Sequence, residues 1–324
     1  MAVPGIGGAD DLIVVGELCV DLIIRLDGDI RFGQHEQLVH STDLVLGSSS
    51  AITACGAAAL GVRTAMASVR GDDEFGAFVA QELATRGVGT QQVRVEHGVP
   101  TGASTHLSRS DGDRAILTSM GTIGRTRAAD VELDGARHLH VGSYFLQRDL
   151  WADAVDLFAA ARARGMSTSL DGNFDPTEQW DCGILALLGH VDIFFANEQE
   201  LRGVTGESSL TDAAASALER MPEGSRLVCK LGAEGALVHT RRAGRIETVR
   251  AETPVAPGSL VDTVGAGDSL AAGFIAAHLS GSTTPVALAV ACGTASTRGA
   301  GGVGAQPDRA TAEALASTVR IARG

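Results

Sequence analysis

Lysine is almost absent from this chain of 324 residues: Lys230 is the only one, and arginine supplies the rest of the 26 basic side chains. P-loop kinases need a Gly-Lys-Ser/Thr run, and Lys230 is followed by Leu231, so that class is excluded. Protein kinases are excluded as well, because neither a catalytic loop nor an Asp-Phe-Gly motif follows Lys230. The scarcity of lysine therefore removes two large enzyme classes.

Aromatic side chains and positive charge are also scarce. Aromatics make up 4% of the chain, which argues against a surface on which single-stranded nucleic acid stacks. Acidic residues number 39 against 26 basic ones, so the formal net charge is −13. This charge would repel a phosphate backbone, and we expect no nucleic-acid partner.

Long apolar runs and paired cysteines are missing too. The longest apolar stretch, residues 285–293, is far shorter than the ~20 residues that a membrane-spanning helix needs. The N-terminal apolar segment is broken at Gly16 and Glu17, so we expect neither a targeting segment nor a membrane partner. The 5 cysteines are widely spaced without a Cys-x-x-Cys pair, which fits neither a zinc ribbon nor a disulfide framework. We expect free thiols in a cytoplasmic protein.

What the chain does have is an alternation of short β-rich runs and longer helical patterns. The strand-like runs are residues 12–15, 64–69, 138–141, 167–170, 191–195, 226–231 and 236–239. The helix-like windows are residues 51–60, 73–86, 151–164, 211–220, 269–279, 286–297 and 310–321. This pattern is typical of an α/β fold with a doubly wound, mostly parallel sheet and helices on both faces. No linker divides the chain, so we expect one domain over residues 1–324.

Two segments, residues 22–46 and 104–118, break the alternation and favour short, partly polar strands. The second is typical of a hairpin, with His106 before and Ile116 after a turn at Asp111 and Gly112. We expect the two segments to form a small β lid on the main sheet. Its strand edges need a cover, and a second copy of the chain in a homodimer is the candidate.

The most informative stretch runs from Asp262 to Asp268 and reads Asp-Thr-Val-Gly-Ala-Gly-Asp. Two close glycines lead into a helix of small residues, whose first N–H groups have no intrahelical acceptor. With the helix dipole they can bind a phosphate or an oxyanion without any lysine. Asp268 beside them can take a proton from an attacking hydroxyl. The plain alternative is an aspartate favoured electrostatically in a first helical turn.

The same stretch resembles the C-terminal signature of the ribokinase / phosphofructokinase-B family of carbohydrate kinases, and further landmarks of that family follow in order over nearly the whole chain. These are Gly16 to Asp21, Gly47 to Ile52 with Ala58 to Gly61, Gly71 to Gly76, Asp171-Gly-Asn173, Asn197 to Glu200, and Lys230 to Gly235. The resemblance implies a ribokinase-like fold that transfers the γ-phosphoryl group of ATP to a carbohydrate hydroxyl, with Mg²⁺ and K⁺ as cofactors. The sugar would be of the fructokinase, ribokinase or 2-keto-3-deoxygluconate kinase type.

The resemblance also implies roles for single residues. Asp268 would be the catalytic base, beside an anion hole of the Gly265, Ala266 and Gly267 amides. Asp262 and the backbone at Val264 would hold the monovalent cation. The other implied residues are Asn197, Glu200, Lys230, Gly232, Glu234 and Gly235 at the nucleotide, with Glu200 placing Mg²⁺ indirectly, and Asp21, Gly47 and Ser48 at the sugar.

Several of these residues have simpler interpretations. Asn197 and Glu200 have the spacing of a helix cap, and Gly232 and Gly235 flank what can be a hairpin turn. Asp21 can cap a loop. The sequence also departs from the family, which has a second glycine at Ser48 and an asparagine at Ile52. Isoleucine cannot hydrogen-bond to a sugar hydroxyl, so both departures leave the choice of sugar open.

Other functions were weighed against sugar phosphorylation. Gly267-Asp-Ser269-Leu spells the motif of GDSL serine hydrolases, but no Asp-x-x-His pair near the C-terminus supplies a base. The run from Gly299 to Gly304 matches the Gly-x-Gly-x-x-Gly pattern of dehydrogenases, yet no strand precedes it. His138 and His140 fit a core strand better than a metal site. A catalytically inactive regulator that responds to sugar or nucleotide stays open as the alternative.

Overall fold

Ten strands form the main sheet of the computed structural model, which describes residues 10–110 and 113–324. Seven neighbouring strands run parallel in the order β5 (Gly89–Glu96), β4 (Thr64–Gly71), β1 (Leu12–Val15), β8 (His138–Val141), β9 (Ser167–Asp171), β10 (Ile193–Asn197) and β11 (Arg226–Lys230). Three antiparallel strands extend the sheet beyond β11: β12 (Ala236–Arg242), β13 (Arg245–Ala251) and β14 (Ile321–Arg323). The expected doubly wound, mostly parallel sheet is confirmed.

The strands of the main sheet that the sequence missed are polar strands at or next to the edges of the sheet. All seven strand-like runs of the sequence are strands of this sheet, whereas β5, β13 and β14 were not predicted. These three carry few fully buried apolar residues, because an edge or one face of each meets solvent. The predicted helix at residues 310–321 was wrong at its end: α9 spans Arg309–Ala316, and Ile321 pairs with Ala251 on the edge of β13.

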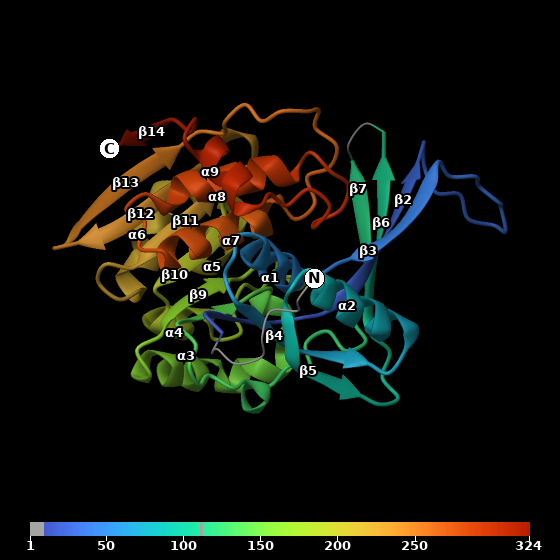
Figure 1. Ribbon diagram of the computed structural model, residues 1–324, viewed down its shortest axis with the longest axis horizontal. Helices are drawn as coiled ribbons and strands as arrows, with labels where there is room; N and C mark the ends of the chain where they lie inside the picture. Colours follow the sequence, from blue (N-terminus) through green and yellow to red (C-terminus); the bar gives the residue numbers. More distant parts are fainter. Residues whose placement is uncertain (1–9, 111–112) are drawn as a thin grey trace.

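Helices cover both faces of the sheet (Figure 1). The first layer comprises α1 (Ser49–Ala59), α2 (Glu74–Thr85), α7 (Ala266–Leu279), α8 (Pro285–Ser296) and α9. The second layer comprises α3 (Ala154–Ala163), α4 (Ile184–Leu187), α5 (Glu198–Thr205) and α6 (Leu210–Arg220). Strand β1 shows why both layers are needed. Val14 packs into the first layer and Val15 into the second, so its four-residue apolar run is buried on both sides.

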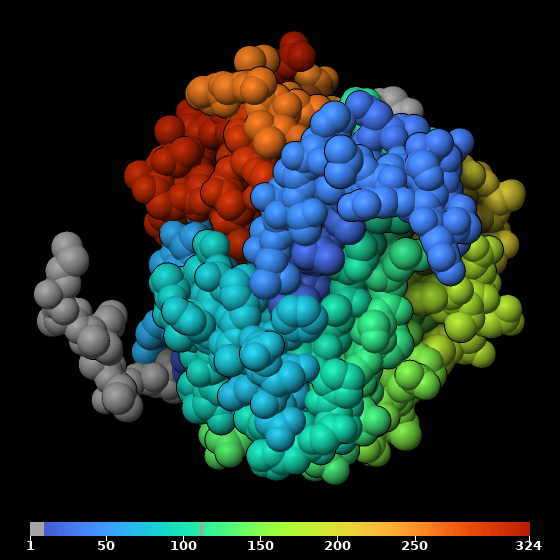
Figure 2. Space-filling view, turned by 90° about the vertical axis from the view of Figure 1, so that its right-hand side faces the viewer, coloured from blue at the N-terminus to red at the C-terminus, as the bar shows by residue number. Residues whose placement is uncertain are grey.

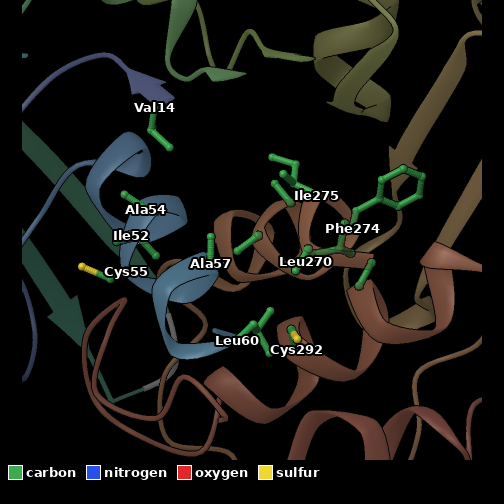
Figure 3. Close-up of a cluster of buried hydrophobic side chains, with 14 of the residues drawn as sticks. Val14, Ile52, Ala54, Cys55, Ala57, Leu60, Leu270, Phe274, Ile275 and Cys292 are labelled. Atoms are coloured by element: carbon green, nitrogen blue, oxygen red, sulfur yellow. The ribbon is translucent and has the colours of Figure 1, made fainter. Parts of the chain in front are cut away.

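Helix α7 is the most enclosed element near the predicted anion loop. Its residues from Ser269 to Ala277 are all buried. Figure 3 shows Ile52 and Ala57 of α1 facing Leu270 and Phe274 of α7, with Cys292 of α8 beside them. Gly273 lets α8 approach closely, since a Cβ there would lie 2.9 Å from the Leu288 carbonyl oxygen. The start of α7 is therefore held in place by the first-layer core.

A separate four-stranded sheet, the lid, stands out from the body (Figure 1). Its strand order is β3 (Ser41–Leu46), β2 (Cys19–Leu26), β6 (Gly102–Arg109) and β7 (Arg114–Ser119). The expected hairpin is confirmed by the antiparallel pairing of His106 with Ile116, and its predicted turn residues Asp111 and Gly112 lie outside the described residues. The lid starts earlier than expected, so Asp21 lies within β2 and not just past the first strand. In Figure 2 the lid segment near the N-terminus arches over the face turned to the viewer.

The sequence predicted that no segment spans a membrane and that the cysteines are free thiols. Within residues 10–110 and 113–324, no helix is long and apolar enough to cross a membrane. All five cysteines are free thiols, and four of them are buried, while Cys182 is partly exposed.

Candidate active site

A cleft of about 920 Å³ opens between the lid and the carboxyl ends of the parallel strands. Strands β9, β10 and β11 end at this edge of the sheet, and their last residues are Asp171, Asn197 and Lys230. The start of α7 lines the same cleft, as do Asp21 and His106 of the lid. Ligands of open α/β sheets bind outside the carboxyl ends of the strands, which is where this cleft lies.

The first turn of α7 presents backbone donors to the cleft. Gly265 is the N-cap with φ of +71°, and its close contact with the Cα of Gly302 leaves no room for a side chain. The Ala266 N–H donates to the Thr263 carbonyl oxygen at 3.3 Å, so that amide is already used. The Gly265, Gly267 and Asp268 N–H groups have no acceptor among the described residues. Two of the three expected amides, those of Gly265 and Gly267, are therefore free to bind an anion, and the Asp268 N–H is a further free donor.

Asp268 places a buried carboxyl group beside these donors. Burial raises the pKa of its carboxyl group to about 7, and the negative charge of Asp171 adds to the rise. Lys230 and a hydrogen bond from Ser49 act in the opposite direction. A carboxylate whose pKa lies near neutrality is well matched to accept a proton at physiological pH. This pKa cannot be read from the sequence, because it depends on groups from three other elements.

The anion loop was expected to bind an anion without any lysine, but the structure places Lys230 against it. Its Nζ lies 2.8 Å from Oδ2 of Asp171 and 3.7 Å from Oε2 of Glu200. The same side chain runs along the anion loop, since a Cβ on Gly267 would lie 3.4 Å from Cδ of Lys230. Burial lowers the pKa of Lys230, but the charges of Asp171 and Glu200 raise it more, so the side chain stays an ammonium ion. The loop itself contains no lysine, yet the fold brings one against it.

Asn173 links the base to the rest of the site. Its side-chain amide donates to Ser49 Oγ at 2.9 Å and to Ser143 Oγ at 3.2 Å, and its backbone N–H donates to Asp171 Oδ1 at 3.1 Å. Ser143 in turn donates to Glu17, a fully buried carboxyl group. Asp171 and Asn173 belong to a motif of the family, but the sequence alone predicts no role for them. Their place just after a buried strand was the available signal.

Asn197 and Glu200 form the helix cap that the simpler interpretation expected. Asn197 donates its backbone N–H to Glu200 Oε2 at 2.8 Å and its side-chain amide to Oε1 at 2.7 Å. The Glu200 N–H donates back to Asn197 Oδ1 at 2.9 Å, which completes a capping box at the start of α5. Both residues also line the cleft, so the cap fixes where their polar atoms stand.

The turn between β11 and β12 forms one rim of the cleft. Gly232 and Gly235 line it, whereas Glu234 does not. The Glu234 carboxylate is 72% exposed and accepts a hydrogen bond from Arg250 at 2.8 Å. The structure thus brings the two glycines to the cleft and turns the carboxylate toward a neighbouring strand.

At the lid, Asp21 is buried and lies 3.3 Å from His106 Nε2. Gly47 lies directly behind it and does not line the cleft: a Cβ there would stand 2.2 Å from Asp21 Oδ1.

Ser48 lines the cleft with φ of +77°, a conformation that favours glycine. Its hydroxyl caps α1 by accepting from the Ala51 N–H at 3.0 Å, and donates to the Glu17 carbonyl oxygen at 2.5 Å. These two hydrogen bonds stabilise Ser48 in a backbone conformation that glycine adopts more readily.

Ile52 adds an apolar wall to this end of the cleft. It is 3% exposed, and its side chain packs on the backbone of Gly302, where a Cβ would lie 2.2 Å from Ile52 Cδ1. Its carbonyl oxygen accepts from Gln306 Nε2 at 2.8 Å. Ile52 therefore braces the loop behind the anion site and offers a ligand only hydrocarbon.

Asp262 joins two loops near the anion site. Its Oδ1 accepts from the Val264 N–H at 3.0 Å, and its Oδ2 accepts from the Gly301 N–H at 3.1 Å. Val264 lines the cleft, whereas Asp262 lies behind it. The glycine loop at residues 299–304 is thereby tied to the α7 start.

The competing interpretations find no support in the geometry. Ser269 is 1% exposed and accepts a hydrogen bond from Gln306, and no histidine is bonded to it in the described part of the chain, so it has no base. The glycine loop follows helix α8 and not a strand, which excludes a dinucleotide-binding turn. His138 and His140 are both buried and share Ser169 Oγ, at 2.7 and 2.8 Å. They belong to the core.

A doubly wound sheet, a β lid and a buried carboxyl group beside free helix N–H groups fit a phosphotransferase that acts on a small hydroxyl compound. The sequence matches the pfkB family of carbohydrate kinases over residues 9–307, and the chain belongs to this family. It is a carbohydrate kinase with the ribokinase-like fold.

Three comparisons illustrate the range of its relatives. An ATP-dependent ribose-1-phosphate kinase of Halopiger xanaduensis is 29% identical over 312 residues, which cover 94% of this chain and 97% of the relative. A 2-dehydro-3-deoxygluconokinase of Bacillus subtilis is 30% identical over 263 residues, 77% of this chain and 78% of the relative. The solved structure of Arabidopsis thaliana ribokinase with ribose and ATP superposes with a TM-score of 0.79 at 23% identity, covering 95% of this chain and 99% of the other.

Proposed function

We propose that this carbohydrate kinase transfers the γ-phosphoryl group of ATP to a hydroxyl of a small sugar, with Asp268 as the base. The observation that carries the proposal is the position of Asp268: a buried carboxylate with a pKa of about 7 next to the free amides of an α7 start. The relatives named for ATP-dependent sugar phosphorylation support the choice of donor.

The transfer step follows from these groups. The Asp268 carboxylate takes the proton of the sugar hydroxyl as its oxygen attacks the γ-phosphorus, and the bond from that phosphorus to the β–γ bridging oxygen breaks. The bridging oxygen leaves on ADP with its electron pair. The free Gly265, Gly267 and Asp268 N–H groups would bind the equatorial oxygens, where negative charge is concentrated during transfer. Ala266, whose N–H donates to the Thr263 carbonyl oxygen, shapes this loop.

Magnesium fits the nucleotide end of the cleft in an indirect way. No group of three or more acidic, histidine or cysteine side chains suited to a metal occurs in the described residues. Both Glu200 oxygens already accept from Asn197, so their remaining lone pairs suit water ligands of the ion better than the ion itself. Mg²⁺ commonly keeps several waters and takes its other ligands from substrate phosphates. Asn197 and Glu200 would hold it in that manner, and the ion would neutralise phosphate charge.

A monovalent cation, K⁺, is proposed beneath the anion loop. Asp262 supplies a fixed carboxylate within two residues of Val264, whose carbonyl oxygen is the second proposed ligand. Both Asp262 oxygens accept backbone N–H groups but keep further lone pairs for a cation. A cation there would stabilise the loop that carries the free amides.

For the nucleotide, we propose that it lies along Lys230, Gly232 and Gly235 and that the glycine loop at 299–304 borders its base. Glycine N–H groups can approach phosphates closely because no side chain intervenes. We propose that Glu234, which turns toward Arg250, lies at the rim of the nucleotide site.

For the sugar, we propose a site formed by Asp21, Gly47 and Ser48. The Asp21 carboxylate can accept from two neighbouring hydroxyls, and Gly47 makes room for it. Ile52 offers an apolar contact at this end of the cleft, so a sugar of the fructokinase, ribokinase or 2-keto-3-deoxygluconate kinase type would bind without a hydrogen bond to that side chain.

We further propose that residues 1–324 act as one domain whose lid segments close over the sugar and that two copies pair through the lid in a cytoplasmic homodimer. The lid exposes large apolar side chains, notably Phe32 at 93% and Leu38 at 88%. Strands β3 and β7 are unpaired at their outer edges. Sedimentation of the protein and of a Phe32→Asp/Leu38→Asp variant checks this: a wild-type monomer would contradict the dimer.

The kinase proposal is tested by ATP turnover against a panel of ribose, fructose and 2-keto-3-deoxygluconate. We expect sugar-dependent ADP release that Asp268→Asn abolishes. The alternative is an inactive regulator, which would bind a sugar or ATP in calorimetry but release no ADP with any sugar. Binding without turnover would therefore replace the proposed function.

A further inference from the structure

Lys230 stands between two sets of groups at the floor of the cleft. On one side its Nζ meets the Asp171 carboxylate at 2.8 and 3.2 Å and Glu200 at 3.7 Å. On the other side lies the anion loop, where a Cβ on Gly267 would be 3.7 Å from Nζ. The side chain is 14% exposed, so most of it is shielded from water. A small rotation of the flexible Lys230 side chain would carry its ammonium group from the carboxylates to the anion loop.

The partners of Lys230 do not depend on it alone. Asp171 Oδ1 also accepts from the Asn173 N–H at 3.1 Å, and both Glu200 oxygens accept from Asn197. Neither carboxylate would be left without a donor if the ammonium group moved. Removing a cation from a buried carboxylate is costly when nothing replaces it, and here backbone and amide donors remain.

The floor of the cleft is otherwise negative. Glu200 and Asp268 line it with carboxyl groups, a third carboxylate, Asp171, lies next to it at Lys230 Nζ, and the anion loop supplies only neutral amides. An incoming polyphosphate therefore needs a cation at this point. The other basic residues that line the cleft, Arg114 and Arg298, lie on the lid and in the loop after α8. Lysine suits the task because its ammonium is a compact charge on a flexible stem with three donors.

We propose that Lys230 is a mobile catalytic cation that leaves Asp171 for the γ-phosphoryl group and stabilises it during transfer. This inference rests on the proposed function and assigns a step to the only lysine of the chain. Asp171 is then the residue that positions Lys230, not a ligand of the substrate. The anion hole is completed by a side chain from a different strand, 37 residues before Gly267 in the sequence (267 − 230).

The ion pair of Lys230 and Asp171 should also influence the pKa of Asp268. The charged and hydrogen-bonding groups that face Asp268 are Asp171 from β9, Lys230 from β11, Glu17 after β1 and the Ser49 hydroxyl from α1. Asp171 and Lys230 act on the pKa of Asp268 in opposite directions. Lys230→Met should move the acid limb of the pH–rate profile to higher pH, and Asp171→Asn should move it to lower pH. A merely structural role for the pair would not shift the limb in opposite directions.

The kinetic test compares Lys230→Met, Lys230→Arg and Asp171→Asn with a matched control. We expect Lys230→Met to lower kcat about 10²–10³-fold with a smaller change in KM for ATP, as for other donors that act in the transition state. Lys230→Arg keeps the charge and should recover part of this loss. The control is Arg162→Met, which removes the cation of a partly buried ion pair with Asp192 at the opposite end of the strands. A Lys230→Met enzyme within about threefold of the wild-type kcat would overturn the inference.

A second measurement does not depend on turnover. Labelling with [¹⁵Nζ]lysine gives a single side-chain signal, because Lys230 is the only lysine, and the signal vanishes in Lys230→Met. We expect it to shift when Mg²⁺ and the non-hydrolysable ATP analogue AMPPNP are added to the wild type, and to shift much less with MgADP, which has no γ-phosphate. Equal spectra with the two nucleotides would refute the mobile cation. If the wild type phosphorylated no sugar, the proposed function would fall, whereas activity that is lost in Asp268→Asn but kept in Lys230→Met would overturn this inference alone.

Discussion

The two ends of the cleft are built in different ways. At the α7 end, the anion donors are backbone N–H groups on a helix buried from Ser269 to Ala277, so the core fixes their positions. At the lid end, Asp21 and His106 are side chains on strands of a four-stranded sheet that projects from the body. The lid also exposes apolar residues such as Phe32 and Leu38, and its strand β7 is exposed throughout.

We expect the α7 end of the cleft to carry out the chemistry and the lid end to select the sugar. Backbone donors keep their direction when surface residues change, because moving them would disturb α1, α7 and α8 together. Lid side chains can be exchanged one at a time without repacking a core. We therefore expect changes at the α7 end to lower the rate with every sugar, and changes at the lid to alter which sugar binds.

The strongest test of the α7 end is Asp268→Asn, which keeps the shape and removes the base. General-base catalysis typically contributes about 10²–10⁴-fold, so kcat should fall by that factor with every sugar tested. The check is steady-state kinetics, with circular dichroism to show that the variant is folded. Near-full turnover by the Asn variant would show that Asp268 is not the base.

Asp21→Ala is the matching test of the lid end. Hydrogen bonds to a charged group are worth about 1.5–3 kcal/mol each, so sugar affinity should fall roughly 10- to 150-fold. ATP affinity should hardly change, because Asp21 lies at the opposite end of the cleft from Gly232 and Gly235. Titration calorimetry with both ligands decides the matter. Equal losses for sugar and ATP would indicate a folding defect, and an unchanged sugar affinity would place the sugar elsewhere.

The pH dependence sharpens the comparison because it depends on the α7 end alone. The pKa of Asp268 is raised to about 7, and only the deprotonated carboxylate can accept the proton. Below that pH the rate should fall roughly tenfold per unit, and above it the rate should level off. The limb should have the same midpoint in the Asp21→Ala variant. A profile that is flat between pH 5 and about 8 would contradict the assignment of the base.

The smallest expected effect is that of the monovalent cation. Replacing K⁺ by Na⁺ or choline should lower kcat by less than the loss of the base does, since the proposed ion acts on the amides through the Asp262 loop. Rates measured at constant ionic strength provide the check. Identical rates in all three buffers would remove the cation site at Asp262 and Val264.

The sequence determined the architecture and the motif at which we propose the chemistry. Apolar runs and their spacing predicted seven strands of the main sheet, because strands buried on both faces must be apolar throughout. The Gly-Ala-Gly-Asp run predicted a loop that leads into a helix at residue 269, and α7 starts three residues earlier, at Ala266, with Gly265 as its N-cap at φ of +71°. The lid segments were recognised because their polar strands differ from the buried ones.

Only the tertiary structure decided how distant residues act on one another. Lys230, Asp171 and Asp268 lie on three different elements, and their distances set both the ammonium position and the pKa of the base. The sequence shows no lysine in the anion loop, whereas the fold places one against Gly267. Polar edge strands such as β14 likewise form only because a partner edge is available. Electrostatic interactions and edge pairing depend on separation in space, and spacing along the chain does not contain that information.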